Sequence, residues 1–336
     1  MIDGLEIRPV RGIGDVTAGD DLAELITRAA PWLADGDVLV VTSKIVSKAE
    51  GRLVEVPADG PDREEARQRA LAGETARVVA RRGPTTIVQT HHGFVMAAAG
   101  IDASNVDKTH LVLLPADPDA SARALRADLL RRGLDVAVII SDTMGRAWRN
   151  GLTDVALGAA GIEAFRDHRG EIDPYGNELS LTQMAVIDEL SAAAELVKGK
   201  RDRVPVAVVR GYPRSAEGSG AAVLVRDSES DMFSLGTAEA RASGLRAAAG
   251  LGDQRAANAD PAAVERALDT VSGLLTAGVT RRPDGVRLTP AGDGPAALIR
   301  LGTDSHRLRA ALAAEGVPTV ATIDDDGTTL TFGDPS

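Results

Sequence analysis

The stretch IISDTMGRAWRNG, residues 139–151, combines the pattern of a buried strand with side chains that bind metal ions and phosphate. The apolar residues 136–140 predict a core strand, and Asp142 and Thr143 follow it directly. A carboxylate and a hydroxyl at the end of a strand suit a hard metal ion, and Arg146 suits phosphate. In the alternative interpretation Asp142 caps the next element. This stretch alone leaves both interpretations open.

The residue two positions after Asp142 tests one alternative class of enzyme. A phosphatase of the haloacid-dehalogenase type needs a second aspartate there, and this chain has Met144. Asp142 therefore fits a metal ligand better than a phosphoryl acceptor.

A second stretch, DGDVLVVTSKIVSKAEGR at residues 35–52, predicts a strand followed by a helix. Ser43 and Lys44 lie at the expected helix start and Lys48 lies one turn later, so two ammonium groups and free backbone N–H donors meet where an anion can bind. The stretch is not a Walker loop, because GxxxxGK[ST] is absent. A solvated lysine face is the alternative.

Two further loops offer oxygen ligands. In AAAGIDASNVD, residues 97–107, Asp102 and Asn105 lie three positions apart in a polar turn and can share one ligand. In VVRGYPRSAEGSGAAVLVRD, residues 208–227, Glu217 lies in a glycine-rich loop that lets the backbone approach a ligand. Taken alone, the first loop is better explained by ordinary turn chemistry, and a plain hairpin-like loop is the competing account of the second.

The elements that must position these loops alternate between short apolar runs and helical patterns. Strands are expected at residues 38–42, 86–90, 111–114, 136–141, 205–210 and 221–225, and helices at 20–33, 62–82, 118–132 and 181–198. Near residue 240 the composition shifts to alanine, glycine and arginine. We therefore expect a main domain at 1–245, a linker at 246–260 and a small α+β module at 261–336, with helices at 261–277 and 304–315, a hairpin near 282–285, a strand at 296–301 and two final strands.

Composition limits the possible functions. The formal charge of −11 and the 2% aromatic content argue against nucleic acid and anionic membrane as partners. The absence of cysteine excludes thiolate chemistry and leaves oxygen or histidine to bind any metal. The amino terminus lacks the pattern of a signal peptide, and no apolar run reaches the roughly 20 residues of a membrane helix. We therefore expect a soluble cytoplasmic protein.

Five separated blocks then agree, in order, with one known family. With DGDVLVVTSKIVSKAEGR, GIDASNVD, LLPADPDASARALR, VIISDTMGRAWRNG and VVRGYPRSAEGSG, residues 1–245 resemble the coenzyme F420-0:L-glutamate ligases, the γ-glutamyl ligases of deazaflavin coenzyme F420. The resemblance implies a mixed α/β fold in an intertwined homodimer. It also implies transfer of the γ-phosphoryl group of GTP to the carboxylate of F420-0, attack of L-glutamate on the acyl phosphate, and γ-linked addition thereafter.

The resemblance also implies roles for individual residues. Two divalent ions, Mg²⁺ or Mn²⁺ with K⁺ assisting, would lie on Asp102 and Asp142 and on Thr143 and Glu217. GTP would contact Ile13, Gly14, Asp15, Val16, Ser43, Lys44, Lys48 and Asn105, and Asp142, Lys48 and Arg146 would act in catalysis.

The chemistry agrees with this allocation, because carboxylate and phosphate repel each other and cations must neutralise them before an in-line approach. Some relatives carry a flavin-binding domain after the ligase part. The tail of this chain is too short for that domain and lacks its arginine-rich start, so we expect no FMN. Two alternatives stay open: a nucleotide-binding regulator without turnover, and a carboxylate–amine ligase that uses another acid.

Overall fold

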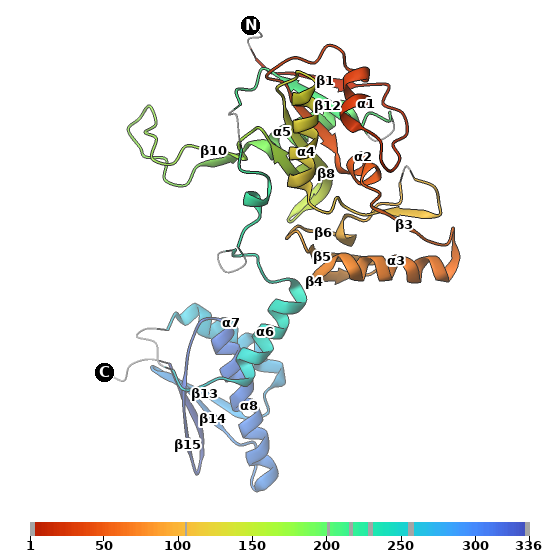
Figure 1. The fold of residues 1–336 in the computed structure, drawn as a ribbon. Coiled ribbons are helices and arrows are strands. Elements are labelled where there is room, and N and C mark those ends of the chain that lie inside the picture. Colours follow the sequence, from red (N-terminus) through yellow and green to blue (C-terminus); the bar gives the residue numbers. More distant parts are fainter. Residues whose placement is uncertain are drawn as a thin grey trace. The chain divides into compact units, whose positions relative to one another are not determined.

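The computed structural model describes residues 4–104, 106–199, 202–214, 218–227, 231–254 and 259–332. The chain divides into two compact units, Met1–Thr237 and Ala238–Ser336, called unit 1 and unit 2 below (Figure 1). Helices and several sheets occur together, which confirms the predicted mixed α/β class.

A five-stranded sheet forms the centre of unit 1. Its strands lie in the order β1 (Glu6–Val10), β12 (Val206–Arg210), β2 (Val38–Thr42), β8 (Ala137–Arg146) and β9 (Arg149–Ala160). Only β2 and β8 pair in parallel, and the other neighbours are antiparallel. The predicted strands at residues 38–42, 136–141 and 205–210 are thus the core of this sheet.

Helices cover both faces of the sheet, and the alternation of side chains along β2 shows why. Leu39 and Val41 pack with α1 (Leu22–Ala29), α2 (Ser43–Ala49) and α4 (Pro118–Arg131) in one apolar cluster. Val38 and Val40 pack with α5 (Val186–Lys198) in another (Figure 1). Because successive strand residues point to opposite faces, a strand covered on both faces is continuously apolar.

Strand β8 extends beyond the edge of its partner β2. The pairing of β2 with β8 ends at Thr42 and Ser141, whereas β8 continues to Arg146 and pairs with β9 alone. The sequence predicted that the strand ends at residue 141, and this was wrong. The β8–β9 hairpin carries Asp142 out of the sheet, so Asp142 caps no following helix.

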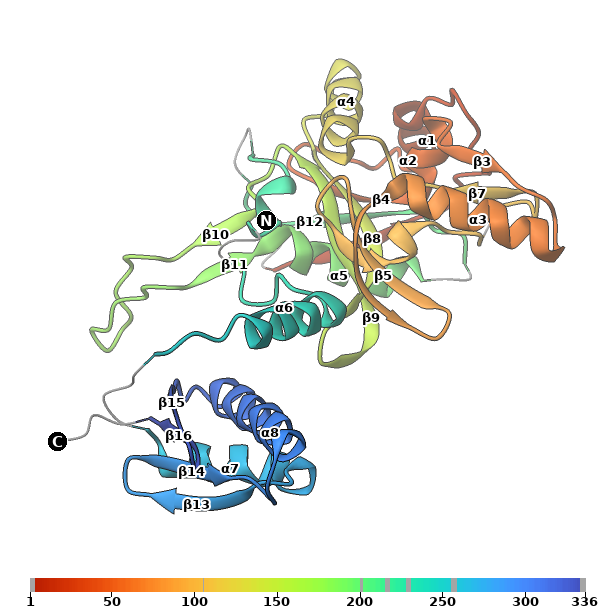
Figure 2. The same cartoon turned by 90° about the horizontal axis from the view of Figure 1, so that it is seen from below.

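A second group of elements in unit 1 lies beside this hairpin (Figure 2). It contains a three-stranded antiparallel sheet, a long helix and a strand pair: β4 (Thr75–Arg82), β5 (Thr85–Thr90), β6 (Val95–Ala97), α3 (Gly60–Glu74), β3 (Leu53–Glu55) and β7 (His110–Val112). A short 3₁₀ helix, Ala98–Gly100, follows β6. From the opposite side of the sheet, β10 (Phe165–Asp167) and β11 (Gln183–Ala185) form an extended ribbon.

Unit 2 has its own apolar core. It contains α6 (Thr237–Ala249), α7 (Pro261–Val271), a 3₁₀ turn (Ser272–Leu274), α8 (Pro295–Ala314) and a sheet in the order β13 (Gly278–Arg282), β14 (Gly285–Thr289), β16 (Gly327–Thr331) and β15 (Val320–Asp324). Leu288, Leu308 and Leu330 are fully buried between the sheet and its helices. The hairpin near residues 282–285 and the two final strands are confirmed.

Three predicted elements were wrong. Residues 221–225 contain a 3₁₀ turn, Ala222–Leu224, in place of a strand. The expected helix at 62–82 ends at Glu74, and residues 75–82, which include the β-branched Thr75, Val78 and Val79, form β4. The expected strand at 296–301 lies inside α8. Short apolar runs fit a buried helix and a strand equally well, which explains the last error.

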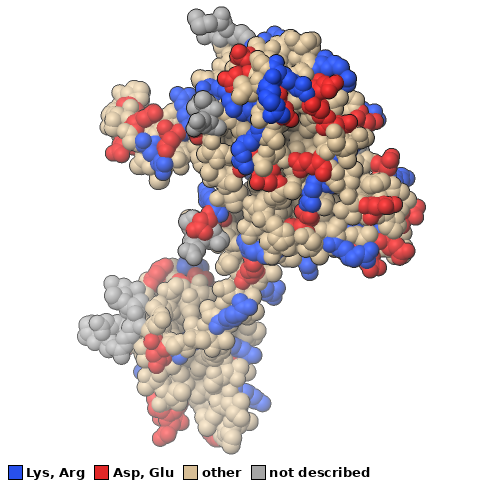
Figure 3. All heavy atoms as spheres, viewed as in Figure 1, with Lys and Arg blue, Asp and Glu red and all other residues tan. Residues whose placement is uncertain are grey.

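None of the helices in the described ranges combines the length and apolar character needed to cross a membrane. On the face shown in Figure 3, acidic and basic side chains lie interspersed over the surface of unit 1.

Candidate functional site

The centre of the candidate site is the carboxyl group of Asp142, on β8 just beyond the last residue that pairs with β2. Burial raises its pKa, and the negative charges of Asp154 and Asp102 raise it further. Hydrogen bonds from the Thr143 N–H and the Ser43 hydroxyl partly offset this, and the resulting pKa is about 6. Residues that are far apart in the sequence therefore meet at Asp142.

Lys44 joins the second carboxylate to the start of α2. Its Nζ lies 2.5 Å from Asp102 Oδ2 and donates to Ser104 Oγ at 2.7 Å. The Ser104 N–H donates to Asp102 Oδ1 at 2.6 Å, which closes the polar turn on itself. Burial alone would raise the pKa of Asp102, but the hydrogen bonds and charge of Lys44 and the bonds from Ser104 outweigh it and hold the pKa below its usual value.

The location of Lys44 follows from the local fold. Strand β2 ends at Thr42, and α2 begins at Ser43 without a side-chain cap. The first N–H groups of a helix have no partner within the helix, so the start of α2 presents N–H donors close to Lys44. Lys48 lies in the last turn of α2, as predicted from the spacing.

The opposite face of the β8–β9 hairpin holds a buried ion pair that sequence reasoning missed. Lys198 Nζ lies 2.9 Å from Asp154 Oδ2 and 3.0 Å from Ser141 Oγ. Lys198 and Asp154 are only 2% and 3% exposed. Thr143 Oγ1 donates to Asp154 Oδ1 at 2.7 Å. Burial raises the pKa of Asp154, but the charge of Lys198 and these hydrogen bonds outweigh it and lower the pKa overall.

Strand geometry separates Asp142 from Thr143. Asp142 pairs with Val155 and Thr143 pairs with Asp154, and residues directly opposite each other in an antiparallel pair share a face. The Thr143 side chain therefore points to Asp154, away from the face that carries Asp142. The two were predicted as ligands of neighbouring cations, and their side chains diverge.

The other predicted nucleotide contacts lie in the turn before α1. Ile13 and Val16 are buried in the same cluster as Ile45 of α2, which ties this turn to the start of that helix, whereas Gly14 and Asp15 are exposed. Arg146 lies at the far end of β8, where its Nη2 donates to the Asn150 carbonyl at 3.3 Å.

The metal ligand set is only partly visible. Asn105 and Glu217, predicted for GTP and metal, lie outside the described residues. Within the described ranges no three acidic or histidine side chains are close enough together to hold a metal ion. Asp102 and Asp142 are the two predicted metal ligands whose carboxylates come together here.

This arrangement lies inside a region that matches a known family model. The model described as F420-0:Gamma-glutamyl ligase matches residues 12–211, from the turn before α1 to the end of β12. The chain belongs to the F420-0:γ-glutamyl ligase family. The family assignment made from the five sequence blocks is confirmed.

Curated relatives of this γ-glutamyl ligase family are similar over most of their length. A protein of Methanothermobacter thermautotrophicus, named coenzyme F420:L-glutamate ligase, is 40% identical over 249 residues, which is 68% of this chain and 99% of the relative. Proteins of the same name from Archaeoglobus fulgidus and Methanopyrus kandleri are 41% and 40% identical and are covered over 91% and 97% of their lengths. Unit 2 lies outside the residues that the family model matches.

Proposed function

We propose that this protein adds L-glutamate to coenzyme F420-0, and then to the γ-carboxylate of the growing tail, with GTP as phosphoryl donor and an acyl phosphate as intermediate. The observation that carries the proposal is the meeting of Asp102 and Asp142 with Lys44 at the start of α2, inside the region that matches the ligase family. The names of the relatives support the substrates, F420 and L-glutamate.

The donor set fits a hard divalent cation, Mg²⁺ or Mn²⁺. Burial, together with the negative charges of Asp154 and Asp102, raises the pKa of Asp142, and a cation beside the Asp142 and Asp102 carboxylates would offset that penalty. Asp142 and Asp102 would hold the first ion. Glu217 and Thr143 are proposed for a second, with K⁺ assisting, and Thr143 Oγ1 would have to release Asp154 to reach it. Bound cations would neutralise the triphosphate and the attacked carboxylate.

Residues of the chain itself would position GTP and its phosphates. Lys44 and Lys48 present ammonium groups along α2, and the backbone N–H groups at the start of α2 face the same region, so the phosphates of GTP would bind there. The turn that contains Gly14 and Asp15 would contact the nucleotide beside α2, and Arg146 would hold phosphate. No protein nucleophile is needed, because the acyl phosphate forms directly between the two substrates.

We also propose that the protein acts as a homodimer. The β10–β11 ribbon extends from unit 1 and exposes Ile172 and Leu181, which are 63% and 90% exposed. Exposed apolar side chains on an extended ribbon suit a contact with a second copy of the chain.

The decisive test is mass spectrometry of F420-0 incubated with the full chain, GTP, Mn²⁺ and L-glutamate. We expect successive glutamyl additions and one phosphate released per addition. Asp142→Asn should abolish the additions, whereas Asp269→Asn, at an exposed position of α7, should leave them unchanged. GTP and Mn²⁺ binding without added mass would indicate a regulator, and additions to a different acid only would indicate another carboxylate–amine ligase.

A further inference from the structure

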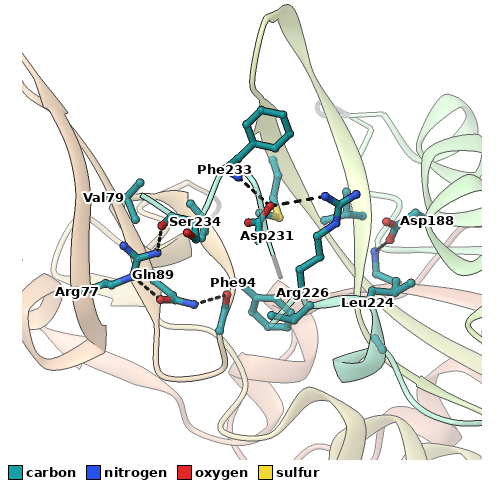
Figure 4. A pocket seen from close by; sticks show the side chains of 17 residues that line it. Arg77, Val79, Gln89, Phe94, Asp188, Leu224, Arg226, Asp231, Phe233 and Ser234 are labelled. Carbon is teal, nitrogen blue, oxygen red and sulfur yellow. Dashed lines mark hydrogen bonds and ion pairs between the residues drawn. The ribbon is translucent and has the colours of Figure 1, made fainter. Parts of the chain in front are cut away.

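Unit 1 contains a cavity of about 300 Å³ for which the function proposed above has no assigned role (Figure 4). Four parts of unit 1 line it: the β4–β5–β6 sheet, the β8–β9 hairpin, Asp188 of α5, and residues from the segments 221–226 and 231–234. Its volume lies at the lower end of the range for small-molecule sites.

The cavity begins on the face of the hairpin that carries Asp142. Met144 lies two residues after Asp142 on β8, so the two side chains point to the same face. Val155 pairs directly with Asp142, and both Met144 and Val155 line the cavity. A molecule in the cavity can therefore extend along one face of the hairpin to the candidate reaction centre.

Aromatic side chains gather at this cavity although the chain has few of them. The whole sequence has eight, two Trp, two Tyr and four Phe. Phe94 and Phe233 line the cavity. Phe233 in turn makes an edge contact with Trp148 at the hairpin tip, with ring centroids 4.7 Å apart. Phe233 and Trp148 are 57% and 80% exposed, so the pair offers flat apolar surface at the rim of the cavity.

The polar groups of the cavity suit the edge of a heterocycle better than a phosphate. Arg77 Nε donates to Gln89 Oε1 at 2.6 Å, and its Nη2 donates to the Ser234 carbonyl at 2.7 Å (Figure 4). Asp188 and Asp231 also line the cavity, and their carboxylates would repel a phosphate. Amide, guanidinium and carboxylate groups together match a ring edge that has both donors and acceptors.

We propose that this cavity binds the deazaflavin ring of F420-0, with Phe233 as a ring-contacting residue that sets specificity for the acceptor. The inference rests on the function proposed above. F420-0 carries its flat ring at one end and the reacting carboxylate at the other. Residues 142 to 146 of β8 span roughly 13 Å at the rise of an extended strand. The hairpin is thus long enough to hold the carboxylate at Asp142 and the ring near Phe233.

The test measures the affinity of the full chain for F420-0 through the fluorescence anisotropy of the deazaflavin ring, without GTP, metal or glutamate. Phe233→Ala should weaken binding about tenfold, because an aromatic contact to a flat ring is lost. Met232→Ala is the matched control, because Met232 is a neighbouring exposed apolar residue that does not line the cavity. In turnover, Phe233→Ala should raise the KM for F420-0 about tenfold and leave the KM for GTP and for glutamate unchanged.

The outcomes separate this inference from the proposed function. Equal affinity for F420-0 in Phe233→Ala, Met232→Ala and the unaltered chain would overturn the ring site, even if glutamate is still transferred. A change of oligomeric state in Phe233→Ala with unchanged affinity would assign the cavity to a subunit interface and also overturn it. Affinity that depends on Phe233 without any glutamyl addition would support the ring site and refute the ligase proposal alone.

Discussion

Replacing Asp142 by asparagine should stabilise the metal-free protein, the opposite of what loss of a buried polar group usually does. Asparagine keeps an oxygen that can accept from the Thr143 N–H and the Ser43 hydroxyl, and it removes the charge that burial, Asp154 and Asp102 disfavour. The pKa of Asp142 is about 6 in the folded state, against 3.8 for an unperturbed aspartate side chain.

The sign and size of the change in the free energy of unfolding follow from proton linkage. Between pH 4 and 6 the folded chain binds more protons at Asp142 than the unfolded chain, so the free energy of unfolding falls as the pH rises through this window. A difference of about two pKa units corresponds to about 3 kcal/mol. Because Asp142 is partly exposed, solvent screening reduces this, and we expect Asp142→Asn to add about 1–2 kcal/mol at pH 8 and almost nothing at pH 4.

The assay is urea unfolding in EDTA, followed by tryptophan fluorescence. Trp32 and Trp148 are the only two tryptophans and both lie in unit 1, so the signal reports on this unit. Asp102→Asn is the matched control with the opposite sign, because the pKa of Asp102 is lowered and its charge stabilises the fold above pH 4. Destabilisation at pH 8 by Asp142→Asn would refute the electrostatic reasoning.

Mn²⁺ should make the unaltered chain more stable than the Asp142→Asn variant, which reverses their order in EDTA. A cation held by Asp102 and Asp142 binds only the folded state and should raise the unfolding midpoint of the unaltered chain with increasing concentration. Asp142→Asn should show little of this rise. An equal rise in both proteins would place the cation elsewhere.

Three further predictions concern packing and buried charge. Lys198→Met should lower the free energy of unfolding of unit 1 by about 3–5 kcal/mol, because Asp154 stays buried without its cation, and adding Asp154→Asn should restore much of the loss in urea titrations. Gly158→Ala should cost about 1–3 kcal/mol in the same titrations, because a Cβ there would lie 2.1 Å from the Pro118 carbonyl oxygen at the start of α4. Asp304→Ala should destabilise unit 2 by about 1–2 kcal/mol, because the part-buried N–H groups of Thr276 and Ala277 lose the buried carboxylate that accepts from them. The lowered pKa of Asp304 makes this contribution present above pH 4 and lost as the pH falls further, which circular dichroism of the full chain can follow.

Local sequence patterns predicted the elements that depend mainly on their own residues. Strands β2, β8 and β12 are recognisable from their continuous apolar runs, and the start of α4 is recognisable from its Asp-Pro pair. The extension of β8 beyond Ser141 depends on its partner β9, which the residues of β8 alone do not show. The strand pattern that continues after residue 74 competes with the helical pattern before it, and pairing with β5 decides between them.

The candidate site likewise contains residues that the sequence predicted and residues that it did not. The meeting of Asp102, Asp142 and Lys44 could be predicted, because each of the three residues comes shortly after an apolar stretch of the sequence that forms a buried element. Asp154 and Lys198 could not, because an aspartate in a strand and a lysine at a helix end normally face solvent. The divergence of Thr143 from Asp142 needed the strand register, which no spacing in the sequence supplies.

The ion pair of Lys198 and Asp154 explains how a hairpin that has left its sheet can still position a reaction centre. Beyond Ser141 the hairpin has lost the strand β2, and with it the packing that holds β8 inside the sheet. Lys198 at the end of α5 contacts Ser141 and Asp154, one on each strand, and Asp154 also accepts from Thr143. An apolar pair could bury the same area but would tolerate a shift of the two strands, whereas these directional bonds are lost if the register changes. We therefore expect the stability that this pair contributes to matter less for function than the fixed register, which keeps Asp142, Met144 and Val155 together on the opposite face.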